Sequence, residues 1–202
     1  DIEPDCNDLI VADGTTTSSY VPVYGASGAQ SEFIYPASML TAMIGLPISS
    51  IKFYASSAVS LSKTLTVKVE EVSATTESSS SWSYSAATTV YTGNASLSSN
   101  KEMEIVFSTP FIYNGGNLCF NICAPGYSSS VSWYGQSMSS NTSCYDWSIT
   151  PPVSGPYSSA SFLPKASFAY CAPAEACPTV DAPVASNVEV TTATLTWNEG
   201  EG

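Results

Sequence analysis

Residues 64–70 read Thr-Leu-Thr-Val-Lys-Val-Glu, and polar and apolar side chains alternate at every position. Because successive side chains of a strand point to opposite faces, this spacing predicts a β-strand with one buried face. The same alternation recurs at residues 51–55, 102–107 and 118–123. Four strongly patterned strands therefore anchor an interpretation of the whole chain as all-β.

Shorter strands are expected between these four, at residues 8–12, 19–24, 32–35, 89–92 and 166–171. Turn-forming Gly, Pro and Asn separate them, and many short strands at such spacing are typical of a β-sandwich. Residues 36–45 are the exception, because Ser38 is a suitable N-cap and Gly45 a suitable stop for a short helical turn. Two low-complexity tracts remain, residues 73–87 as a polar hairpin loop and residues 127–164 as a segment that contains short strands. We predict a jelly-roll-like antiparallel β-sandwich.

The balance of charges excludes several classes of function. The chain has 17 acidic residues against five lysines, no arginine and no histidine, for a net charge of −12. Nucleic-acid binding is excluded because no basic surface is available, and anionic membranes are disfavoured for the same reason. No apolar run approaches the ~20 residues of a membrane span, so no membrane insertion is expected. Only 11% of residues are charged, and serine and threonine supply the polar surface, as in secreted proteins.

The lack of histidine also narrows the possible chemistry. Ser-His-Asp and Cys-His arrangements are impossible, as are histidine-based zinc sites. Paired carboxylates remain, and Glu102 and Glu104 share one face of a predicted strand at ~7 Å, within the range of inverting glycosidases. Alternation toward solvent explains this pair better, so we predict no enzyme and no catalytic residue.

Six cysteines indicate disulfides in an extracellular protein. Cys119 and Cys123 lie four residues apart on one predicted strand, too far apart to pair. The first pairing we expect is Cys123 with Cys144. The second is Cys6 with Cys171 or Cys177, and free buried thiols are the alternative. No zinc cluster is expected, because no CxxC spacing occurs.

The end of the chain predicts a second unit. Residues 184–202 contain two short apolar patterns separated by Thr191-Thr192, and the second ends at Trp197. They resemble the first two strands of a fibronectin type III domain, which needs about 90 residues, so the domain would continue past Gly202. We expect a sandwich domain at 1–175, a Pro-containing linker at 176–183 and a partial fibronectin-like β-hairpin at 184–202.

Several segments in order carry a resemblance to a known family. They include Asp-Gly-Thr-Thr-Thr-Ser-Ser-Tyr-Val-Pro-Val-Tyr at 13–24, together with residues 35–40, 48–55, 90–93, 111–115 and 117–121. The stretch 9–171 resembles the jelly-roll domains found beside fibronectin type III repeats in secreted and surface proteins of Bacteroidetes. The resemblance implies a β-sandwich, export to the cell surface or medium, and an accessory role in adhesion or glycan binding. It brings no catalytic residue onto this chain.

Aromatic residues in the second low-complexity tract are the candidate binding site, namely Trp133, Tyr134, Tyr145 and Trp147. Exposed flat rings can stack on sugars, with hydrogen bonds from nearby Gln136, Asn141 and Asp146. The alternative is that these rings plug the ends of the sandwich or mark a protein contact. No metal site is predicted, although the acidic N-terminus, including Asp8 and Asp13, could hold a structural Ca²⁺.

Three functional hypotheses follow. The first is a non-catalytic adhesion module of a secreted or cell-surface multi-domain protein, whose partner is a glycan or a host or cell-surface protein. The second is a structural subunit of an extracellular fibre that self-associates through its C-terminal strands, since two isolated strands are only marginally stable. The third is an accessory domain of a secreted hydrolase.

Overall fold

A computed structural model describes residues 6–147 and 150–172, together with the backbone of residues 184–186 and 194–196. Cys6–Ala172 forms one compact unit, and the C-terminal strands belong to another. The regular secondary structure of the first unit is almost entirely β. Its larger strands are β1 (Cys6–Val11), β3 (Ala29–Tyr35), β4 (Pro47–Tyr54), β5 (Ser62–Val72), β6 (Thr88–Ser96), β7 (Glu102–Ile112), β8 (Asn117–Ala124) and β13 (Ala166–Cys171). The smaller strands are β2 (Thr16–Ser18), β9 (Trp133–Ser137), β10 (Ser143–Trp147), β11 (Ser158–Ala160) and β12 (Phe162–Pro164).

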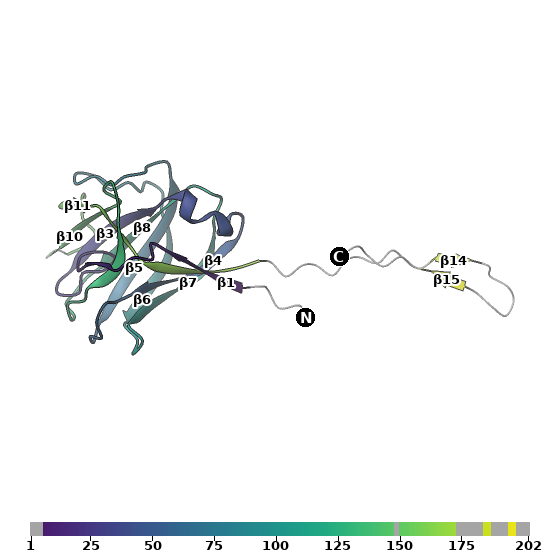
Figure 1. The fold of residues 1–202 in the computed structure, drawn as a ribbon, viewed down its shortest axis with the longest axis horizontal. Coiled ribbons are helices and arrows are strands. Elements are labelled where there is room, and N and C mark those ends of the chain that lie inside the picture. The colour runs from purple at the N-terminus through teal and green to yellow at the C-terminus, as the bar shows by residue number, and fades with distance from the viewer. Residues whose placement is uncertain (1–5, 148–149, 173–183, 187–193, 197–202) are drawn as a thin grey trace. The chain divides into compact units, whose positions relative to one another are not determined.

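These strands form an antiparallel sandwich with jelly-roll connections, as predicted (Figure 1). One sheet has the order β1-β13-β4-β7, and the other has the order β11-β10-β3-β8-β5-β6. The chain changes sheet at every step from β1 through β3 and β4 to β5. Strands β5 and β6 then pair in the same sheet, and the chain changes sheet again from β6 to β7 and from β7 to β8. Eight strands that alternate in this way make up a jelly roll, and we call the eight larger strands the frame.

Aromatic side chains fill the space between the two sheets. Phe33 of β3 packs edge-to-face on Phe53 of β4, with ring centroids 5.9 Å apart. Phe168 of β13 meets Tyr35 at 5.2 Å and Phe120 of β8 at 5.8 Å. Because these contacts join strands of opposite sheets, they show that the apolar faces identified by alternation are the faces that form the core.

A disulfide joins the first and last strands of the frame. Cys6 and Cys171 are directly opposite in the β1–β13 register and are bonded. The prediction that Cys6 pairs with Cys171 or Cys177 is therefore confirmed in its first form, while Cys177 lies outside the described residues. Since β1 is the edge of its sheet, the bond holds an otherwise one-sided strand in place.

The expected Cys123–Cys144 bond is wrong. Cys123 lies on β8 and Cys144 on β10, and β3 runs between those strands, so the two positions are two strands apart. At the ~4.8 Å spacing of neighbouring strands that separation exceeds disulfide reach. Both are buried free thiols, as is Cys119.

Two local predictions also need correction. The structure has no strand at 19–24, where one was expected. Strand β2 ends just before, at Ser18, because the Ser18 hydroxyl accepts hydrogen bonds from the backbone N–H groups of Tyr20 and Val21 and so turns the chain. Residues 36–45 do form helical turns, but these are two 3₁₀ turns, Ala37–Met39 and Thr41–Met43. The first is capped not by Ser38 but by Asn117, whose Oδ1 accepts the Ala37 N–H at 2.9 Å.

The long polar tracts have different structures. The described residues of the tract 127–164 contain short strands, as predicted, namely β9, β10, β11 and β12, and β12-β9-β2 forms a small third sheet. Residues 73–87 form the expected loop between the hairpin strands β5 and β6, but the loop is not simply exposed, because Glu77 within it is buried. Strand β8 is buried on both faces rather than one.

The C-terminal segment contains the predicted pair of strands. Strand β14 (Val184–Ser186) pairs antiparallel with β15 (Thr194–Thr196), with Val184 opposite Thr196. The fibronectin-like character of this hairpin stays a prediction, and Trp197 lies outside the described residues.

Candidate functional site

The candidate site is built around strand β10, near one edge of the six-stranded sheet. Tyr145 and Trp147 lie two residues apart on β10, so their side chains share one face. Strand β10 pairs with β3 on one side and with the short β11 on the other. Both rings are half-buried, and the frame therefore holds them rigidly while part of each remains accessible.

Three more tyrosines complete an aromatic cluster, which we define as Tyr20, Tyr24, Tyr145, Trp147 and Tyr157. Tyr20 stacks parallel on Tyr145 with centroids 4.6 Å apart and lies 5.1 Å from Trp147. Trp147 meets Tyr157 edge-to-face at 4.6 Å, and Tyr157 is 68% exposed. Offset-stacked and edge-to-face pairs are the favourable ring geometries, so the cluster is a preformed apolar surface.

A groove of about 420 Å³ adjoins this cluster. Tyr20, Tyr145 and Phe162 form part of its wall, and the remainder is supplied by residues 16–19, which read Thr-Thr-Ser-Ser, and by Ala160 and Ser161. Apolar rings beside several hydroxyl groups are the combination that binds a sugar, whose ring has apolar C–H faces and a polar rim. No charged side chain is among the described residues that line the groove.

The structure brings together only two of the four predicted binding residues. Tyr145 and Trp147 belong to the aromatic cluster, but Trp133 is fully buried and packs on Phe53 in the core. Its Nε1 donates a hydrogen bond of 2.8 Å to the carbonyl of Val23. Trp133 therefore cannot offer a face to a ligand, and its side chain belongs to the core. Tyr134 is half-buried on β9 and makes none of the ring contacts of the cluster.

Two of the polar residues expected near these rings, Asn141 and Asp146, have structural partners. Asn141 donates to Ser159 at 2.9 Å and accepts from Ser161 at 3.0 Å. Asp146 accepts the backbone N–H of Trp147, and Gln136 is exposed on β9. Asn141 thus orients Ser161, a groove residue, rather than serving as a member of the groove wall.

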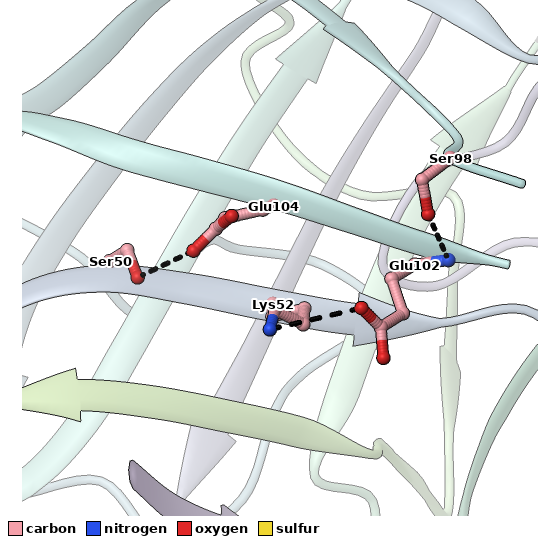
Figure 2. Close-up of polar contacts among 5 residues, drawn as sticks. All are labelled: Ser50, Lys52, Ser98, Glu102 and Glu104. Atoms are coloured by element: carbon pink, nitrogen blue, oxygen red, sulfur yellow. Dashed lines mark hydrogen bonds and ion pairs between the residues drawn. The ribbon is translucent and has the colours of Figure 1, made fainter. Parts of the chain in front are cut away.

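Glu102 and Glu104 lie elsewhere, on the outer face of the four-stranded sheet (Figure 2). Glu102 is 3.8 Å from the Lys52 Nζ, and the Ser50 hydroxyl donates to Glu104 at 3.3 Å. The apolar neighbours Met103 and Ile105 are buried, so the predicted alternation is confirmed. Each glutamate is therefore held by a side chain of the neighbouring strand β4.

The acidic N-terminal segment is only partly described. Asp8 is exposed on β1, and Asp13 forms an ion pair with Lys165. Lys165 also lies 4.9 Å from the centroid of the Tyr54 ring. Asp13 is thus already occupied by a cation of the chain itself, and the predicted Ca²⁺ site there stays a prediction.

Comparisons with known proteins give no relative for this chain: no family model, no curated protein and no solved structure matches it. In the described part of the chain, the structure contains no helix with the length and apolar character needed to cross a membrane.

Tyr20 and Tyr24 are members of the cluster that sequence reasoning missed, and Tyr20 is the one that contacts Tyr145 and Trp147. Tyr20 is the more instructive case. It lies in a turn after β2, far from Tyr145 along the chain, and no strand register connects them. Its only sequence signal is its place in a stretch of Thr, Ser and Tyr residues, residues 13–24. Ring stacking between a turn and a distant strand is a tertiary contact, and periodicity does not predict it.

Proposed function

We propose that this chain is a non-catalytic glycan-binding module of a secreted or cell-surface protein and that it binds sugars at the aromatic cluster and its groove. The observation that carries the proposal is the contact of Tyr20, Tyr145 and Trp147 beside a wall of hydroxyl groups. The frame pre-orders these rings, so little conformational entropy is lost when a ligand stacks on them.

The charge of the chain favours a neutral glycan. The groove lining supplies hydroxyls and phenols but no lysine, and the whole chain carries a net charge of −12. Sulfated or uronic-acid polymers would meet a repulsive field with no compensating ion pair. The cluster also contains several aromatic rings, which suits the successive sugar units of an oligosaccharide better than a single sugar.

Calorimetric titration with neutral oligosaccharides selected on a glycan array would test the proposal. Removing a central aromatic anchor typically costs 2 kcal/mol or more, so Trp147→Ala should weaken affinity by roughly 30-fold. Tyr157→Ala should weaken it by about 5–10-fold, because this ring is at the edge of the cluster and makes one ring contact.

Tyr91→Ala is the matched control. Tyr91 is also a half-buried tyrosine, but it lies on β6, at the opposite edge of the same sheet from β10 and β11. It should leave the glycan affinity unchanged. The proposal fails if the wild-type protein binds no glycan, or if Tyr91→Ala weakens binding as much as Trp147→Ala does.

A further inference from the structure

A second cluster of functional groups lies on the outer face of the six-stranded sheet, away from the core. The strand registers place Cys144 of β10, Glu32 of β3 and Asn121 of β8 side by side in one row. The loop 73–87 covers this row and adds Glu77, whose backbone N–H donates to the Asn141 carbonyl at 2.8 Å. Three potential metal ligands, Glu32, Glu77 and Cys144, therefore converge beneath a loop, with all three ligand atoms within 4.8 Å of one another.

Hydrogen bonds hold these three side chains in place, but one carboxylate oxygen of Glu77 has no hydrogen-bond partner. Glu32 accepts from the Ser83 backbone N–H and, at 3.2 Å, from the Asn121 amide. The Oε2 atom of Glu77 accepts from the Ser83 hydroxyl at 2.7 Å and from the Cys144 thiol at 3.5 Å. Glu77 is only 5% exposed, yet its Oε1 has no hydrogen-bond partner. A buried carboxylate oxygen without a partner is costly, and its position points to a missing ligand.

Burial raises the proton affinity of all three groups of the cluster. Burial and the neighbouring charge of Glu77 raise the pKa of Glu32 to about 8. Burial likewise raises the pKa values of Glu77 and of the Cys144 thiol. The cluster therefore holds protons near neutral pH, and a divalent cation that binds there has to displace them.

We propose that Glu32, Glu77 and Cys144 form a Zn²⁺ site that fastens the loop 73–87 to the sheet. One sulfur and two carboxylate oxygens form a donor set that Zn²⁺ accepts, whereas Ca²⁺ and Mg²⁺ require oxygen ligands alone. Tetrahedral Zn²⁺ with Zn–S of about 2.3 Å and Zn–O of about 2.1 Å places sulfur and oxygen about 3.6 Å apart. The distance from the Cys144 Sγ to the Glu77 Oε2 is 3.5 Å.

Binding is an exchange of protons for the metal. The Cys144 thiol and any protonated carboxyl of the pair release their protons to solvent, and Zn²⁺ takes their place. Three protein ligands leave a fourth position for water. The Asn121 amide and the Ser83 backbone N–H already orient Glu32, as outer hydrogen bonds do in metal sites.

The test uses the full chain, stripped with EDTA and titrated with ZnCl₂ by calorimetry near neutral pH. We expect one Zn²⁺ per chain and a rise in Tm of about 5–10 °C at a free concentration of 100 times Kd. Cys144→Ser and Glu77→Gln should each weaken Zn²⁺ binding by about 100-fold or more, since outer partners alone contribute 10–100-fold. CoCl₂ should give a thiolate-to-metal absorption band that Cys144→Ser abolishes.

Cys123→Ser is the matched control, because Cys123 is a buried free thiol on the same sheet that supplies none of the three ligands. A serine hydroxyl there can keep the hydrogen bond that the Cys123 thiol donates to Asn121. It should keep both the Zn²⁺ affinity and the cobalt band. The proposal is overturned if stripped wild type neither binds Zn²⁺ nor gains Tm, a result that does not depend on whether any variant folds. It is also overturned if Cys144→Ser retains the wild-type affinity, if Cys123→Ser loses it, or if the protein binds CaCl₂ but not ZnCl₂.

Discussion

Removing the Cys6–Cys171 disulfide should destabilise the domain more than any single core substitution of moderate size. The bond links residues 165 apart, so it restricts nearly the whole unfolded domain. The chain-entropy relation for a loop of that length gives about 5 kcal/mol at 25 °C. Cys6 is exposed and Cys171 half-buried, so the double substitution Cys6→Ser/Cys171→Ser removes little packing and isolates the effect of the cross-link.

Urea unfolding followed by circular dichroism measures this loss. The double variant should unfold with a free energy lower by about 5 kcal/mol, and its Tm should fall by roughly 10–20 °C, at 2–4 °C for each kcal/mol. Its m-value should rise, because an unfolded chain without the cross-link exposes more surface. Wild-type protein in reductant should behave like the variant, since the other described cysteines are already free thiols.

A loss below about 1 kcal/mol, with the bond verified by mass spectrometry in the wild type, would refute the reasoning. It would mean either that the unfolded chain is already compact around these termini or that β1 contributes little to the folded state. Hydrogen exchange separates the two. In the first case the amides of β1 stay protected in the variant, and in the second only those amides lose protection.

Three further substitutions test the fold. Lys63 is buried, and its Nζ donates hydrogen bonds to the carbonyls of Tyr24 and Ser27. Burial lowers the pKa of Lys63 from 10.5 to about 8, so the folded state binds fewer protons than the unfolded state between pH 8 and 10.5. Stability relative to Lys63→Met should rise by up to about 3 kcal/mol across that window, measured by urea unfolding at each pH, and a flat difference would contradict the assignment. Gly135→Ala should cost about 3 kcal/mol in unfolding free energy, because a Cβ there would collide with the Leu163 carbonyl and the Phe162 ring. Trp133→Phe should cost about 2–3 kcal/mol by leaving the Val23 carbonyl unpaired, yet should leave glycan affinity unchanged; a selective loss of binding would restore Trp133 to the site.

Side-chain alternation was sufficient to predict the frame because most of its strands bury one face only. Leu65, Val67 and Val69 on β5 and Met103 and Ile105 on β7 all face the core as expected. The rule fails on β3, where every residue is buried. Its sequence, Ala-Gln-Ser-Glu-Phe-Ile-Tyr, suggests a partly exposed strand, but the loop 73–87 covers the polar face.

The candidate sites were less predictable than the frame for the same physical reason. Tyr145 and Trp147 were identifiable as aromatics in a polar tract, but Trp133, of the same type and in the same tract, lies in the core. Glu32 looks like a solvent-facing residue of a strand, and only a loop more than 40 residues later makes it part of a buried cluster. Local periodicity determines which face a side chain occupies, whereas tertiary packing determines what covers that face.

Both proposed sites depend on segments added to the eight-stranded frame. The insertion between β8 and β13 supplies Tyr145, Trp147 and Cys144, and the long β5–β6 loop supplies Glu77. The two segments also touch each other, since the Trp82 Nε1 donates to the Val153 carbonyl at 2.9 Å. In rigid scaffolds, function commonly resides in such connecting segments because they vary without disturbing the core. Ordering the loop 73–87 would therefore also support the neighbouring segment that leads to Tyr157, whose backbone N–H donates to Tyr145.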